Sequence, residues 1–151
     1  MAHRRAGTVA PEWATRRRLA HHSRGSRTRR SPVLRGDWSV ESGYLAGKRI
    51  AARDDVTAVF CSNDQMALGF YRAVAEADKR VPQDISVVGF DDTADARGYA
   101  PPLTSMHQDF AEVGQRCVSS ALALVGGRDV PALSVVVPQL VVRDSTAPPA
   151  L

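Results

Sequence analysis

The chain has 151 residues, of which 44% are hydrophobic and 24% are charged, and its formal net charge is +4. This length allows one domain with a hydrophobic core, and no apolar run approaches the roughly 20 residues that a membrane helix needs. Because no apolar segment follows the basic N-terminal residues, no secretory signal is indicated, and a cytoplasmic location is expected.

The charge is divided unevenly along the chain. Residues 1–36 contain ten arginines, no lysine and one acidic residue, a net charge of +9, whereas residues 37–151 contain ten basic and fifteen acidic residues, a net charge of −5. We therefore expect a basic, disordered or non-native segment over residues 1–31, a patterned domain over 32–147 and a short tail over 148–151. The functional alternative for the first segment is a basic arm on nucleic-acid phosphates.

From Pro32 onward, apolar periodicity predicts strands and helices in alternation. In chain order these are a short strand at 33–35, a helix capped by Ser39 to about residue 53, a strand at 56–62 and a helix opened by Asn63 and Asp64 to about residue 77. There follow a strand at 85–90, a loop, a strand at 104–108, a helix capped by Asp109 that ends at Gly126-Gly127, and an edge strand at 134–142 that Pro138 interrupts. This order predicts an α/β fold, with a mostly parallel sheet and helices on both of its faces.

Motifs for catalysis and metal binding are absent from the sequence. There is no phosphate-binding loop, no nucleophile elbow and no zinc-ligand spacing. Asp91 and Asp92 are neighbours in the chain, so strand geometry points their side chains to opposite faces, and His107 stands alone. Cys61 and Cys117 lie in apolar contexts and are expected to be buried free thiols. We therefore expect no enzyme activity, no cofactor and no metal.

Polar clusters follow three of the predicted strands, namely Asp37-Trp38, Asn63-Asp64 and Asp91-Asp92. Parallel strands bring their carboxyl ends to one edge, where ligands of open α/β sheets bind. A flat tryptophan face beside an asparagine and an ionised aspartate suits a sugar, which has apolar faces and hydroxyl edges. Each residue also has a simpler interpretation: Asn63 or Asp64 as a helix cap, Asp92 as a turn cap and Trp38 as a core residue. Their predicted convergence on one edge favours binding.

Five segments carry a family resemblance: GDWSVESGY, VFCSNDQMALGFYRAV, VPQDISVVGFDDT, PPLTSMHQDFAEVG and LVVRDST. In this order they resemble the effector-binding domain of the LacI/GalR (lactose-repressor-like) family of bacterial transcription regulators, over about residues 33–147. The resemblance implies the C-terminal subdomain of a type I periplasmic-binding-protein-like fold. It implies effector contacts by Trp38, Asn63, Asp91, Gln108 and Phe110, and a dimer interface that includes Leu68, Asp95 and Tyr99.

The resemblance also implies a truncated regulator. The family's helix-turn-helix headpiece and N-terminal subdomain have no counterpart in this sequence, so operator DNA would be bound only through a headpiece that the chain lacks. The expected partners are a small-molecule effector, a carbohydrate, and a second copy of the chain, with no membrane. Residues 16–22 resemble weakly the segment that holds the family's effector-binding arginine, with Arg18 as the match. Two alternatives stay open: a solute-binding protein of the same fold, and a small α/β enzyme.

Overall fold

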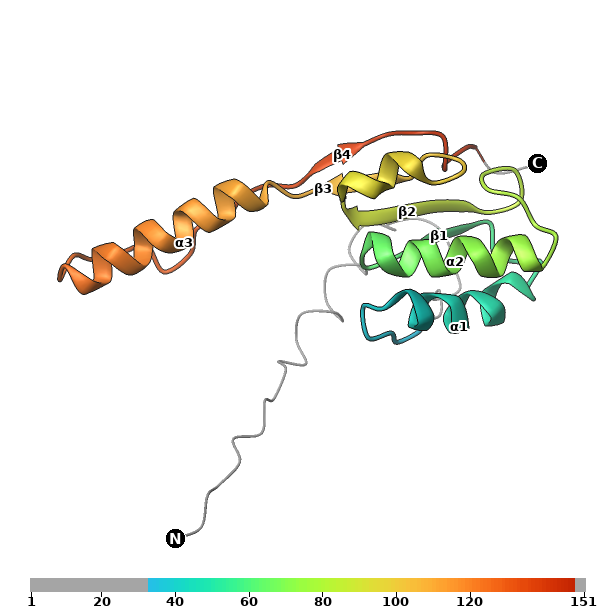
Figure 1. Cartoon of the computed structure of the whole chain (residues 1–151), viewed down its shortest axis with the longest axis horizontal. Helices are drawn as coiled ribbons and strands as arrows, with labels where there is room; N and C mark the ends of the chain where they lie inside the picture. The colour runs from blue at the N-terminus through green and yellow to red at the C-terminus, as the bar shows by residue number, and fades with distance from the viewer. Residues whose placement is uncertain (1–32, 149–151) are drawn as a thin grey trace, which may run out of the picture. The chain divides into compact units, whose positions relative to one another are not determined.

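The computed structural model describes residues 33–148 (Figure 1). Their elements, in chain order, are α1 (Val40–Ala51), β1 (Ala58–Phe60), α2 (Asp64–Glu76), β2 (Ser86–Asp91), the 3-10 helix η1 (Ala94–Gly98), β3 (Thr104–His107), α3 (Phe110–Val125) and β4 (Gln139–Val141). Within this range no helix combines the length and apolar character needed to cross a bilayer.

The three α-helices begin where the sequence predicts. The side chains of Ser39, Asn63 and Asp109 accept hydrogen bonds from the backbone N–H groups of Ser42, Met66 and Glu112, respectively. Each bond satisfies one of the N–H groups that the first turn of a helix leaves without an intrahelical partner. The predicted caps are therefore confirmed.

The four strands form one sheet in the order β1-β2-β3-β4. β1 pairs with β2 and β2 with β3 in parallel, whereas β4 pairs with β3 in antiparallel orientation at the edge. α2 packs against β2, and α1 packs against α2 (Figure 1). The mostly parallel α/β sheet and the edge position of the last strand are therefore confirmed.

Three predicted strands are shorter than expected or missing. Residues 33–35 form no strand, residues 56–62 contribute only Ala58–Phe60, and residues 134–142 contribute only Gln139–Val141. A strand extends only as far as a neighbouring strand pairs with its backbone groups, and the β1 ladder has only three residue pairs. In the last case Pro138, which has no N–H to donate, directly precedes the paired residues.

The core lies between α2 and the sheet, and its largest fully buried apolar side chains are Phe70, Val74, Ile85, Val87 and Leu103. Glycines allow the backbones of α1 and α2 to come into direct contact. A Cβ atom on Gly69 would overlap the carbonyl oxygen of Val40, and one on Gly43 would overlap the backbone of Met66.

The prediction of two buried thiols is correct for Cys61 and wrong for Cys117. Burial raises the pKa of the Cys61 thiol to about 12. Cys117 lies on α3, which has no buried residue. The apolar periodicity of α3 predicts that one helix face is buried. No part of the described chain buries that face, so the side chains of Val118 and Leu122 are also exposed.

Candidate functional site

The carboxyl ends of β1, β2 and β3 lie at one edge of the sheet, because these strands run in the same direction. We call this the carboxyl edge. Asn63 follows β1, Asp91 ends β2 and Gln108 follows β3. The structure arranges the predicted effector residues there as two hydrogen-bonded groups, one around Asn63 and one around Asp91.

Asn63 holds Trp38 in an unusual backbone conformation. The Asn63 amide Nδ2 donates a 2.9 Å hydrogen bond to the carbonyl oxygen of Trp38, while Oδ1 accepts the capping bond from Met66. Trp38 has φ = 72°, in the left-handed region that bulky residues rarely occupy. Because 64% of Trp38 is exposed, it is not a core residue. Asn63 is therefore both a helix cap and the support of an exposed tryptophan.

The residue before Trp38 adds a fixed negative charge. The hydroxyl of Ser39 donates a 2.5 Å hydrogen bond to Asp37 Oδ1, and the backbone N–H of Ser39 donates a second one at 3.1 Å. These bonds, with that of Ser42, lower the pKa of Asp37 to about 2. Asp37 is therefore an anion over the whole neutral range.

Asp91 and Gln108 form the second group. Gln108 Nε2 donates a 2.9 Å hydrogen bond to Asp91 Oδ1, and the backbone N–H of Gln108 reaches the Asp91 carbonyl oxygen at 3.4 Å. Phe110, exposed at the start of α3, donates its N–H to the carbonyl oxygen of Gln108 at 3.0 Å. Asp91 has φ = 101°. An acceptor carboxylate at the end of β2 thus lies beside an amide that follows β3 and an aromatic ring that begins α3.

The fully buried carboxylate of Asp64 connects the two groups. Its Oδ1 accepts a 2.6 Å bond from the Ser105 hydroxyl, and its Oδ2 accepts a 2.7 Å bond from the backbone N–H of Thr93. Ser105 Oγ in turn accepts from the N–H of Asp92 at 3.2 Å. The sequence predicted Asp64 as part of a polar cluster at this edge or as a helix cap, and the part played by Ser105 was missed. Two adjacent polar residues, Thr104 and Ser105, inside the predicted strand 104–108 were the available signal.

Asp91 and Asp92 have different partners, but the strand geometry assumed for them is wrong: β2 ends at Asp91, and both residues have positive φ values. Asp92 Oδ1 lies 2.6 Å from Arg143 Nη2, and Asp92 Oδ2 lies 3.2 Å from His107 Nδ1. His107 therefore has a charged neighbour that the sequence did not reveal. Arg143, in the late LVVRDST segment, was also missed as a contributor to this edge.

The three residues expected at a dimer interface have different surroundings. Leu68 on α2 is 42% exposed and Asp95 in η1 is exposed. Tyr99 is partly buried: its hydroxyl donates a 2.9 Å bond to the carbonyl oxygen of Asp64, and its ring centroid lies 5.5 Å from that of Tyr71. Tyr99 therefore packs within its own chain, and the interface stays a prediction. Arg18 lies outside the described residues.

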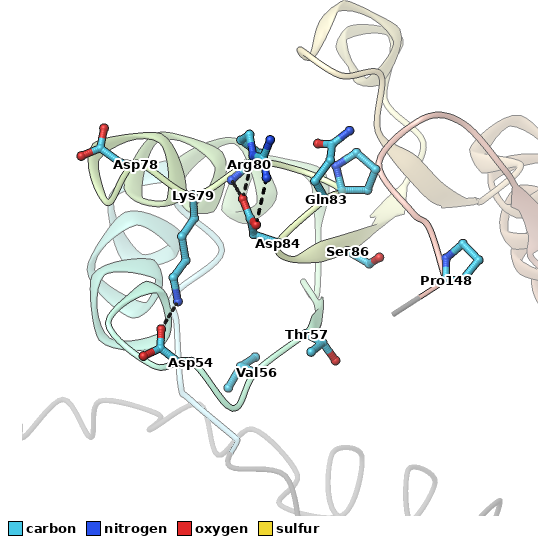
Figure 2. A pocket seen from close by; sticks show the side chains of 11 residues that line it. Asp54, Val56, Thr57, Asp78, Lys79, Arg80, Gln83, Asp84, Ser86 and Pro148 are labelled. Atoms are coloured by element: carbon cyan, nitrogen blue, oxygen red, sulfur yellow. Dashed lines mark hydrogen bonds and ion pairs between the residues drawn. The ribbon is translucent and has the colours of Figure 1, made fainter. Parts of the chain in front are cut away.

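A separate hollow of about 570 Å³ lies at the opposite end of the sheet (Figure 2). Thr57, which precedes β1, and Ser86, which begins β2, line it. Four of its charged groups form ion pairs: Lys79 Nζ lies 3.0 Å from Asp54 Oδ1, and Arg80 pairs with Asp84 (Figure 2). None of the predicted effector residues lines this hollow.

Comparisons with known proteins agree with this fold. A profile of the periplasmic binding protein-like domain matches residues 2–146. The lactose operon repressor of Escherichia coli is 40% identical over 147 residues, which are 95% of this chain and 41% of that protein. The chain thus spans about two fifths of the length of this relative.

Solved structures of bacterial regulators are also similar to the chain. A Lac repressor bound to ONPG has a TM-score of 0.69 and 45% identity, over 74% of this chain and 34% of that one. A regulator from Enterococcus faecalis with bound ribose has a TM-score of 0.70 and 32% identity, over 76% of this chain and 43% of that one.

Proposed function

Because this chain belongs to the LacI/GalR family, with its periplasmic binding protein-like domain, we propose that it provides one wall of the effector site of a transcriptional regulator. The effector is a carbohydrate, bound at the carboxyl edge of the sheet. The chain binds the effector without catalysing a reaction, and it does so in the cytoplasm, where operator DNA lies.

One observation carries this proposal: the conformation of the backbone at the carboxyl edge. Trp38, Asp91 and Asp92 have φ values of 72°, 101° and 54°. Such residues cost about 1–3 kcal/mol each and cluster where function requires a particular side-chain direction. Here buried polar side chains hold two of the three: Asn63 donates to the carbonyl oxygen of Trp38, and Ser105 accepts from the N–H of Asp92. The fold thus stabilises an exposed tryptophan and a carboxylate that the core does not need.

The chemistry of the edge matches that of a sugar. The exposed Trp38 ring provides an apolar plane for the C–H face of a pyranose or furanose ring. The Asp91 carboxylate accepts from hydroxyl groups, and the amides of Asn63 and Gln108 both donate and accept. Phe110 provides a second apolar surface. ONPG and ribose, named in the structures of two relatives, share this combination of apolar faces and hydroxyl edges.

The wider role of the regulator follows from its relatives. In the proposed mechanism, two copies associate through a surface that includes Leu68, Asp95 and Tyr99, and operator DNA is bound by a headpiece outside this sequence. An effector changes DNA affinity if it binds the DNA-competent and DNA-incompetent arrangements with different affinities.

Titration of the full chain with ribose and with ONPG, followed by NMR, tests the proposal. We expect shifts at the Trp38 indole and at the Asn63 and Gln108 side-chain amides. A single wall leaves much of a ligand in water, so the expected binding free energy is on the order of −4 kcal/mol, a millimolar dissociation constant. Micromolar binding would contradict the single-wall arrangement, and turnover of either probe would favour the enzyme alternative.

Variants of Asn63 separate binding from stability. Asn63→Asp keeps the oxygen that caps α2 but removes the amide that donates to Trp38, so we expect weaker binding with the fold retained. Asn63→Ala removes both and should also lose about 1 kcal/mol of stability, the usual contribution of an N-cap. Equal binding by Asn63→Asp and the unmodified chain would show that the Trp38 support is not needed.

A further inference from the structure

The Asp92 carboxylate lies between two side chains from distant parts of the sequence. Arg143 Nη2 is 2.6 Å from its Oδ1 and His107 Nδ1 is 3.2 Å from its Oδ2. The side chains of Asp92 and Arg143 are only 9% and 12% exposed. No described group donates a well-directed hydrogen bond to Asp92 Oδ1. The positive charge of Arg143 is therefore what offsets the burial of this oxygen.

Arg143 is itself held in place. Its Nη1 donates a 2.6 Å hydrogen bond to the carbonyl oxygen of Leu103, at the entry to β3, and its backbone N–H donates to the Thr104 hydroxyl at 2.9 Å. The guanidinium therefore spans from β3 to the end of β2. This anchoring distinguishes it from the ion pair of Arg80 and Asp84, in which Arg80 is 70% exposed.

Asp92 occupies the second of two consecutive left-handed positions. Residues that carry a Cβ adopt this region only when their surroundings over-determine it. The Asp92 N–H is held by Ser105 Oγ, and its side chain is held by Arg143 and His107. The preceding residue, Asp91, has φ = 101°, and its carboxylate accepts the hydrogen bond from Gln108.

We propose that Arg143 is a positioning residue for the effector site. Acting through Asp92, it fixes the turn at the end of β2 and so presents the Asp91 carboxylate, together with Gln108, to the ligand. The inference rests on the proposed function, since the Asp91 carboxylate has a ligand to meet only if the carboxyl edge binds one.

The test is Arg143→Met in the full chain, which keeps the aliphatic length and removes the charge. The readouts are the side-chain amide signals of Gln108 and the backbone couplings that report φ at Asp91 and Asp92. We expect the Gln108 side-chain amide to lose the chemical shift of its hydrogen-bonded state. We also expect the φ values of Asp91 and Asp92 to leave the left-handed region. Arg80→Met, which breaks an exposed arginine–aspartate pair, is the matched control and should change neither signal.

Arg143→Lys keeps a positive charge opposite Asp92, so we expect it to retain the Gln108 signal. If Arg143→Met fails to fold, Asp92→Asn replaces it. Asparagine tolerates the left-handed region, so this variant should fold. It removes the negative charge that faces Arg143. It should give the same loss at Gln108. Unchanged Gln108 and φ signals in Arg143→Met or Asp92→Asn, or their loss in Arg143→Lys, would overturn the proposal.

A ligand titration separates this inference from the function on which it rests. With ONPG and ribose as probes, Arg143→Met should weaken binding about tenfold, the effect of losing one hydrogen bond between a ligand hydroxyl and the charged Asp91 carboxylate. If the unmodified chain binds neither probe, the proposed function fails for both of them. The Gln108 signals still decide whether Arg143 positions Asp91.

Discussion

The hydroxyl of Ser105 donates a 2.6 Å hydrogen bond to the carboxylate of Asp64, and both residues are completely buried. Ser105 belongs to β3 and Asp64 opens α2. This bond joins the sheet to the first turn of the helix that carries Asn63 as its cap. The carboxyl edge therefore depends on a polar contact inside the core.

Replacing Asp64 by alanine should destabilise the fold. It leaves the Ser105 hydroxyl and the Thr93 N–H without their acceptor, at a cost of about 3 kcal/mol in the free energy of unfolding. Urea denaturation measures the change. Asp54→Ala is the control, because its carboxylate pairs with Lys79 but is 99% exposed, and such pairs contribute little. Similar losses in both variants would contradict the role given to Asp64.

The close crossing of α1 and α2 makes Gly69 intolerant of a side chain. A Cβ atom there overlaps the Val40 carbonyl oxygen, so Gly69→Ala should force the helices apart and cost about 3 kcal/mol or more. Gly114→Ala on α3 is the control, since a Cβ there meets nothing within 4 Å. It should stabilise the helix by about 0.5–1 kcal/mol. Thermal unfolding of the two variants should move in opposite directions.

The fold should lose stability at alkaline pH. Burial raises the pKa of Tyr71 and of Tyr99 to about 12, whereas an unfolded tyrosine ionises at about 10. Because the folded pKa values are higher, their contribution is complete below about pH 10 and is lost as the pH rises from about 10 to about 12. Tyrosinate absorbance and urea denaturation across this range measure the effect. Ionisation of both residues at pH 10 in the folded chain would refute it.

Leu68→Arg tests the expected self-association. Leu68 is 42% exposed on α2, so a charged side chain there should weaken dimers in sedimentation without changing the circular dichroism of the fold. Leu45→Arg, at an exposed position of α1, is the control and should leave association unchanged. Unfolding of the Leu68 variant, or sedimentation identical to that of the unmodified chain, would count against an interface at this residue.

The sequence by itself determined where the helices begin. Ser39, Asn63 and Asp109 each cap a backbone N–H only three residues away, so the interaction is local and its signature can be read along the chain. The alternation of strands and helices likewise predicts a mostly parallel sheet, and thereby that Asn63 and Asp91 share one edge.

Only the tertiary structure decided how those residues are held and how far the strands extend. Ser105 meets Asp64, and Arg143 meets Asp92, although the partners are 41 and 51 positions apart in the sequence. Such contacts depend on strand order and register, which set neighbours that local sequence does not encode. The exposure of Cys117 is also a matter of tertiary structure, because its burial depends on whether another surface covers α3. Periodicity specifies an apolar helix face, but burial requires a second surface to remove that face from water.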